Sequence, residues 1–212
     1  EGIEVSTGSL GQGLSIGVGL ALAMRLDAID SKVFVLMGDG EMQEGSVWEA
    51  LMNANSQKLD NLVVLIDKNN LQIDGNVNDI KTLEPLDKKL EAFGFEVKSI
   101  DGHDYDELEK AFKEAKEQKK LQAIILNTIK GKGVSFMENN VSWHGKAPND
   151  EEYKKAIELL EKCYELYCGI FGEAHPDTVI LLGKFIMLSY QIISVKISDF
   201  YINKITDIKF FI

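Results

Sequence analysis

Two short apolar runs, residues 33–37 and 62–66, constrain the fold of this 212-residue chain most strongly. Each run is rich in Val, Ile and Leu, which is typical of a buried strand. Between them, residues 47–57 have the spacing of a helix. A strand, a helix and a second strand in this order predict one βαβ unit, whose two strands are parallel neighbours.

Polar residues follow both predicted strands. Gly38, Asp39 and Gly40 come directly after the first strand, and Asn69 follows the second. The carboxyl ends of parallel strands share one edge of a sheet, where open α/β sheets bind ligands. Carboxylate and amide oxygens suit Mg²⁺ or Ca²⁺, and Mg²⁺ usually completes its shell with phosphates. Glycines let the backbone approach a bulky anion, so the sequence predicts a diphosphate site bridged by a metal.

The segment after this motif indicates where a helix begins. Ser46 and Glu49 have the spacing of a capping box, which predicts a helix start at Ser46. The positive end of that helix dipole would then point toward the same edge of the sheet.

Three segments together resemble the thiamine diphosphate signature of the transketolase family, over residues 1 to about 160: STGSLGQGLSIGVGLALA, GDGEMQEGSVWEALMNA and LVVLIDKNNLQIDG. The alternative is an ordinary Asp-Gly turn with an unrelated loop Asn. The resemblance implies that Asp39, Asn69 and the Leu71 carbonyl hold Mg²⁺ or Ca²⁺. It also implies that Gly38 and Gly40 approach the diphosphate of the cofactor.

Further site residues come from the same resemblance. Gly8 and Leu10 are expected at the cofactor, with Leu10 and Ile73 on either side of the thiazolium ring. Glu44 matches an acidic position that joins a carboxylate network across the family's dimer. An isolated loop histidine such as His144 is usually only solvated, but the resemblance places it at the diphosphate and near the substrate, as a catalytic residue.

The implied chemistry is transfer of a two-carbon ketol unit from a ketose phosphate to an aldose phosphate. The family's activating glutamate lies on a pyrimidine-binding domain, for which this chain has no candidate. The resemblance therefore implies an N-terminally truncated or split transketolase that needs a C-terminal subunit or second protomer. Two alternatives stay open: another thiamine diphosphate enzyme, such as a deoxyxylulose phosphate synthase or a 2-oxoacid dehydrogenase, and an inactive fragment serving as an interaction module.

The rest of the chain predicts an α/β fold, a doubly wound and mostly parallel sheet. The glycine-rich apolar segment before residue 26 is expected to be a helix that packs very close to its neighbour. The remaining expected elements are a polar loop to about residue 82, helices over 85–93 and 104–118, strands over 95–100 and 121–128, and a long loop to residue 150. His103 is expected in a turn and helix cap.

The character of the chain changes near residue 150. We expect residues 1–150 to form the thiamine diphosphate-binding domain and residues 151–190 to form a helical hairpin similar to one tetratricopeptide repeat. One such repeat cannot bury its own apolar face. Residues 191–212 show no clear period and form a tail of unknown structure.

Charge and cysteine content limit the partners. The net charge of −11 argues against nucleic acid and anionic membranes, which both require a basic face. The longest charge-free stretch near the C-terminus, residues 185–195, is shorter than the roughly 20 residues that cross a bilayer. Cys163 and Cys168 match no zinc spacing, and no signal peptide is recognised at the start of the sequence. We therefore expect reduced thiols in a cytoplasmic protein.

Overall fold

The computed structural model describes residues 3–171, which form two compact units. The first unit runs to Thr128 and the second begins at Ile129. The second helix of the expected hairpin and the expected tail fall in residues 172–212, outside the described residues.

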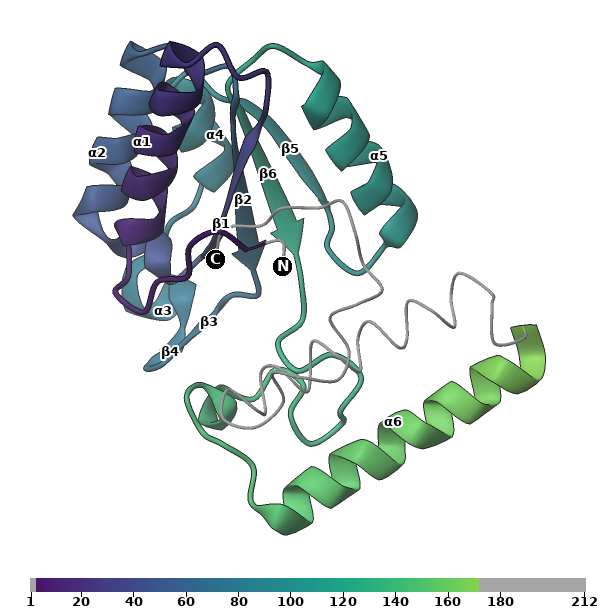
Figure 1. Ribbon diagram of the computed structural model, residues 1–212. Coiled ribbons are helices and arrows are strands. Elements are labelled where there is room, and N and C mark those ends of the chain that lie inside the picture. The colour runs from purple at the N-terminus through teal and green to yellow at the C-terminus, as the bar shows by residue number, and fades with distance from the viewer. Residues whose placement is uncertain (1–2, 172–212) are drawn as a thin grey trace. The chain divides into compact units, whose positions relative to one another are not determined.

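A four-stranded parallel sheet forms the centre of the first unit, in the order β1-β2-β6-β5 (Figure 1). Each pair of neighbouring strands is parallel. The strands are β1 (Val33–Gly38), β2 (Leu62–Lys68), β5 (Glu96–Asp101) and β6 (Gln122–Asn127). The expected α/β class, with β1 and β2 as parallel neighbours, is confirmed.

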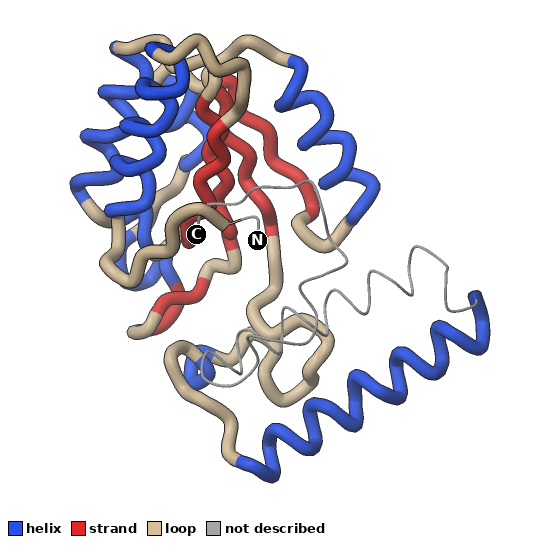
Figure 2. Tube along the Cα trace, viewed as in Figure 1, coloured by secondary structure: helices blue, strands red, loops and turns tan. Residues whose placement is uncertain are grey.

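Helices cover both faces of this sheet (Figures 1 and 2). The step from β1 to β2 and the step from β5 to β6 run in opposite directions across the sheet. Because parallel crossovers are right-handed, their helices lie on opposite faces. One face carries α1 (Gln12–Leu26), α2 (Gly45–Ser56) and α4 (Leu86–Ala92), and the other carries α5 (Tyr105–Glu117).

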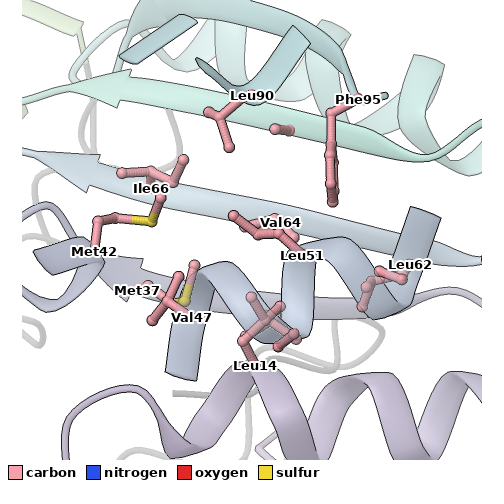
Figure 3. Close-up of a cluster of buried hydrophobic side chains, with 14 of the residues drawn as sticks. Leu14, Met37, Met42, Val47, Leu51, Leu62, Val64, Ile66, Leu90 and Phe95 are labelled. Carbon is pink, nitrogen blue, oxygen red and sulfur yellow. The ribbon is translucent and has the colours of Figure 1, made fainter. Parts of the chain in front are cut away.

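Strand residues alternate between the two cores, as the period of two along a strand requires. Val35 and Met37 belong to the core beneath α1, α2 and α4, whereas Phe34 belongs to the core beneath α5. Figure 3 shows the first core, in which Leu14 of α1 and Leu51 of α2 are fully buried. The continuous apolar runs in the sequence are therefore strands that are buried on both faces.

Gly17 allows α1 to lie very close to the sheet. A Cβ atom at this position would lie 2.3 Å from Cγ2 of Val35 on β1. No side chain fits there, which confirms close packing as the reason for a glycine inside an apolar helix. Gly19, by contrast, is exposed and has nothing within 4 Å of the place of a Cβ.

The segment between β2 and α4 differs from the expected polar loop. It contains a small antiparallel hairpin, β3 (Leu71–Gln72) with β4 (Gly75–Asn76), followed by α3 (Val77–Lys81). The Asn76 side chain accepts a hydrogen bond from the Asn78 N–H at 2.9 Å and so caps α3. Residues of this Asn- and Asp-rich segment therefore form both the hairpin turn and the N-cap of α3.

The expected capping box at Ser46 is wrong. The helix α2 begins at Gly45 with Glu44 as N-cap, and the Glu44 side chain forms no capping hydrogen bond within the described residues. A one-turn helix, η1 (Glu41–Gln43), leads directly into α2, and the Glu44 carbonyl accepts the first bond, from the Val47 N–H at 3.2 Å. Ser46 lies inside the helix against Gly11, where an added Cβ would lie 2.4 Å from Oγ of Ser46.

Asp104 caps α5, whereas His103 lies in the turn before it. The Asp104 carboxylate accepts bonds from the N–H groups of Asp106 and Glu107 at 3.0 and 3.1 Å. The expected turn is therefore confirmed, with the cap one residue further along the chain.

The second unit contains η2 (Val141–Trp143) and the long helix α6 (Asp150–Phe171). Val134, Met137 and Ala156 form a small core there. A capping box begins α6, since the Asn149 side chain accepts the Glu152 N–H and the Glu152 carboxylate accepts the Asn149 N–H, both at 2.9 Å. The expected domain boundary at residue 150 stays a prediction. Along residues 3–171, no helix combines the length and apolar character needed to cross a bilayer.

Candidate functional site

The ends of β1 and β2 bring Asp39 and Asn69 to one edge of the sheet. Gly38 lies in register with Asp67, and the Asp39 N–H donates to the Asp67 carbonyl at 3.1 Å. Both polar residues therefore follow directly from paired strand ends, as the βαβ unit predicts.

The Asp39 carboxylate ties the two strand ends together. Its side chain is only 2% exposed, Oδ1 accepts from the Gly40 N–H at 2.9 Å, and Oδ2 accepts from the Asn70 N–H at 2.6 Å. Burial raises the pKa of Asp39 to about 6, although the two backbone donors act in the opposite direction, and the charge of Asp67 adds to the rise. The unliganded protein thus buries a carboxylate at a cost that a bound cation would offset.

The Asn69 amide has a defined orientation. Its Oδ1 accepts from the Leu71 N–H at 3.0 Å, and its Nδ2 donates to Oδ2 of Asp67 at 3.4 Å. Asn70 between them adopts a left-handed conformation with φ 60°, which asparagine tolerates better than most residues. Asn70 donates to Asp39 and directly follows Asn69, so this turn brings the carboxylate and the amide together.

Asp67 is a residue of this edge that the sequence reasoning missed. It accepts a hydrogen bond from the Thr128 hydroxyl as well as the bond from Asn69. The Thr128 N–H also donates to the Lys68 carbonyl at 3.1 Å, so the end of β6 joins the site. A charged residue at the end of an apolar strand run was the available signal.

Space and an unpartnered oxygen lie beside the Gly-Asp-Gly turn. A Cβ on Gly38 would have no atom of the described residues within 4 Å. A Cβ on Gly40 would lie 3.1 Å from Cβ of Gln72, which brings the β3–β4 hairpin against the turn. Oε1 of Gln72 is buried and has no hydrogen-bond partner among residues 3–171. The turn therefore has open room at one glycine and an unused acceptor near the other.

Glu41 links the N-terminal loop to the same turn, and the sequence reasoning missed it too. Its Oε1 accepts from the Gly11 N–H at 2.8 Å, and its Oε2 accepts from the Gly38 N–H at 3.3 Å. Gly11 adopts a left-handed conformation with φ 81° at the start of α1. The loop before α1 is therefore held at the end of β1.

The apolar residues expected at the cofactor are exposed. Leu10, next to Gly11, is 58% exposed, and Ile73, next to Gln72, is 64% exposed. Gly8 is exposed with nothing within 4 Å of the place of a Cβ. These residues lie on the two segments that adjoin the Gly-Asp-Gly turn.

The two other expected residues are Glu44, at the start of α2, and His144, in the second unit. Glu44 is exposed at the start of α2. His144 belongs to the second unit and is not among the residues that the first unit brings together. Partial desolvation and, as a smaller cause, the charge of Lys130 lower the pKa of His144, which favours the neutral imidazole.

The oxygen donors at the sheet edge fit a hard divalent cation. Within residues 3–171, no cluster of three or more His, Cys, Asp or Glu side chains could hold a metal. The set at the edge is of another kind: one carboxylate, from Asp39, one amide oxygen, from Asn69, and the nearby Leu71 carbonyl. Mg²⁺ and Ca²⁺ accept such mixed oxygen ligands and leave positions for phosphate.

A family model and individual relatives of this chain indicate the same protein family. Residues 1–162 match the family model described as "Transketolase, thiamine diphosphate binding domain". A 6-deoxy-6-sulfo-D-fructose transketolase subunit of Clostridium sp. is 48% identical over 162 residues, covering 76% of this chain and 59% of that protein. An apulose-4-phosphate transketolase subunit of Phocaeicola vulgatus is 45% identical over 167 residues, covering 78% of this chain and 59% of that protein.

Solved structures agree with these relatives. The crystal structure of a Campylobacter jejuni transketolase is 42% identical, with a TM-score of 0.66 over 72% of this chain and 25% of that chain. A Leishmania mexicana transketolase is 27% identical, with a TM-score of 0.58 over 88% of this chain and 32% of that chain. The chain thus spans about three fifths of the length of the two subunits and about a quarter to a third of the solved enzymes.

Proposed function

Because this chain belongs to the transketolase family, as its N-terminal, thiamine diphosphate-binding part, we propose that the edge beyond β1 and β2 holds thiamine diphosphate through Mg²⁺ or Ca²⁺. The observation that carries the proposal is the pairing of Asp39 and Asn69 through the Asn70 turn. Asp39, Asn69 and the Leu71 carbonyl are the proposed metal ligands. The raised pKa of Asp39 supports this role, because a buried carboxylate gains most from a cation.

The neighbouring segments would hold the rest of the cofactor. The open space beside Gly38 and the bare backbone of Gly40 leave room for a diphosphate. Gly8, Leu10 and Ile73 would contact the thiazolium part, since an apolar ring would cover the exposed side chains of Leu10 and Ile73.

His144 would act at the diphosphate and near the substrate. A neutral imidazole offers one N–H donor to a phosphate or hydroxyl oxygen and a second ring nitrogen that can accept a proton. The lowered pKa of His144 supports this neutral form. Glu44, exposed at the start of α2, is the proposed contact to a second protomer.

The proposed reaction is transfer of a two-carbon ketol unit from a ketose phosphate to an aldose phosphate. Thiamine diphosphate supplies an electron sink for cleavage of a carbon–carbon bond. The chain's own residues bind and orient it, and a pyrimidine-binding partner, as a C-terminal subunit or second protomer, would complete the site. Two relatives that are named as subunits support a divided enzyme, and their names indicate sugar and sugar-phosphate substrates.

Calorimetric titration with thiamine diphosphate tests the site. Binding is expected with Mg²⁺ and is expected to be weak or absent after chelation of the metal. Asp39→Ala should abolish the Mg²⁺-dependent part, whereas Asp79→Ala, an exposed acidic residue on α3, should leave it unchanged. Equal binding by the parent protein and Asp39→Ala would refute the site.

Activity tests the reaction separately. Two-carbon transfer should require both this chain and a complementary pyrimidine-binding chain. Transfer by either chain alone would contradict the proposed division of the enzyme, even if thiamine diphosphate binds as expected.

A further inference from the structure

We propose that Glu41 is a positioning residue, which holds the loop that carries Gly8 and Leu10 at a fixed place relative to the Gly-Asp-Gly turn. This inference rests on the proposed function, because it assigns that loop to the cofactor. Glu41 contacts two backbone groups and needs no contact with the cofactor itself.

The geometry joins two segments that are far apart in the sequence. Oε1 of Glu41 accepts from Gly11 at 2.8 Å, and Oε2 accepts from Gly38 at 3.3 Å. Gly11 is the N-cap of α1, so the Glu41 carboxylate also places an anion at the positive end of this helix. One side chain therefore links the start of α1 to the end of β1.

The arrangement requires a carboxylate in particular. Two N–H donors converge on one side chain, and an ionised carboxylate offers two acceptor oxygens. A glutamine offers one oxygen and one NH₂ group, which would face an N–H donor at either Gly11 or Gly38. An aspartate is shorter by one methylene, so it would not reach both donors from residue 41. Glu41→Gln is thus a change of one atom that breaks one of the two links.

The surroundings of the two N–H donors, Gly11 and Gly38, show how Glu41 affects the proposed cofactor site. On one side, Gly11 packs so closely on α2 that a Cβ there would lie 2.4 Å from Oγ of Ser46. On the other side, Gly38 directly precedes Asp39, the proposed metal ligand. Leu10 directly precedes Gly11. Glu41 therefore sets the spacing between an apolar cofactor contact and the metal end of the same cofactor, which a ligand spanning both requires.

Two measurements on the full 212-residue chain test this role. The first is amide hydrogen exchange of residues 8–12 and 38–40 in the unliganded parent, Glu41→Gln and Glu41→Ala. We expect exchange to accelerate about tenfold at residues 8–12 or at residues 38–40 in Glu41→Gln, and at both segments in Glu41→Ala, because bonds to a charged acceptor protect strongly. Glu109→Gln is the matched control, since Glu109 is exposed on α5, where it forms an ion pair with Lys113.

The second measurement is the dissociation constant of thiamine diphosphate with Mg²⁺. We expect it to rise about tenfold in Glu41→Gln, with unchanged stoichiometry and with the control equal to the parent. A residue that only supports folding would instead lower the melting temperature and the stoichiometry and leave the dissociation constant of the folded molecules unchanged. That pattern would overturn the proposal.

The outcomes separate the inference from the proposed function. Parent protein that binds no thiamine diphosphate with Mg²⁺ would refute the proposed function, and the positioning role with it, whatever the exchange data show. Parent protein that binds, together with Glu41→Gln that matches it in exchange and affinity, would overturn the role of Glu41 alone.

Discussion

Replacement of Asp39 by asparagine should change how the stability of the unliganded protein depends on pH. The buried Asp39 carboxyl keeps its proton to a higher pH in the folded protein than in the unfolded chain. The unfolded chain therefore binds fewer protons between about pH 4 and pH 6, so the folded parent protein loses stability as the pH rises through this window. An asparagine does not titrate and removes this contribution.

The size of the effect follows from the pKa. The pKa of Asp39 rises from 3.8 to about 6 on folding, mainly through burial. At about 1.36 kcal/mol per pKa unit, the rise corresponds to about 3 kcal/mol, most of which falls between about pH 4 and pH 7. The variant also loses an acceptor for Gly40 or Asn70, but that loss is the same at every pH. The change in the difference between the two proteins therefore reports the titration of Asp39, including its interaction with Asp67.

Urea unfolding of both proteins, without metal or cofactor, measures this difference. The free energy of unfolding of the variant minus that of the parent should rise by about 2–3 kcal/mol from about pH 4 to about pH 7. Groups that do not interact with Asp39 titrate equally in both proteins and cancel. A difference that stays constant with pH would refute the claim that the fold buries Asp39 at the expense of stability.

Two other substitutions test the packing and the site. Gly17→Ala should lower the free energy of unfolding by about 1–3 kcal/mol, because its Cβ has no room, whereas Gly19→Ala on the exposed side of the same helix should raise it by up to about 1 kcal/mol. Urea unfolding decides this, and equal effects would contradict the close contact of α1 with the sheet. Asp67→Asn should weaken Mg²⁺-dependent cofactor binding about tenfold in calorimetry, since an asparagine cannot accept from both Asn69 and Thr128. Unchanged affinity would exclude an orienting role for Asp67.

The sequence predicted the fold well because its apolar patterns are long and regular. The runs at residues 33–37 and 62–66 contribute side chains to the cores on both faces of the sheet. They therefore contain no polar residue that would interrupt the apolar pattern by which a strand is predicted. The strand ends then placed Asp39 and Asn69 correctly at one edge. The glycine-rich helix was also predicted correctly, since Gly17 has a packing reason that composition alone suggests.

Helix capping was predicted poorly, because a polar residue followed three positions later by Glu forms a capping box in one place of this chain and not in another. Ser46 and Glu49 have the spacing of a capping box, yet the chain enters α2 from η1 and leaves Ser46 inside the helix. Asn149 and Glu152 have the same spacing and do form a capping box. Tertiary contacts, such as Gly11 against Ser46, decide between the outcomes, and they are not local in sequence.

The supporting residues of the site were missed for the same reason. Glu41 acts through Gly11, thirty residues away, and Asp67 acts partly through Thr128, which directly follows β6, a strand that pairs with β2 only in the folded sheet. Neither contact leaves a periodic signal in the sequence.

A crystal structure of the chain with thiamine diphosphate and Mn²⁺ in place of Mg²⁺ tests the central claim most directly. The anomalous signal of Mn²⁺ locates the ion without reference to the fold. We predict one peak within about 2.5 Å of oxygens from both Asp39 and Asn69 and in contact with the diphosphate. A diphosphate bound elsewhere, or an ion that touches neither side chain, would contradict the account.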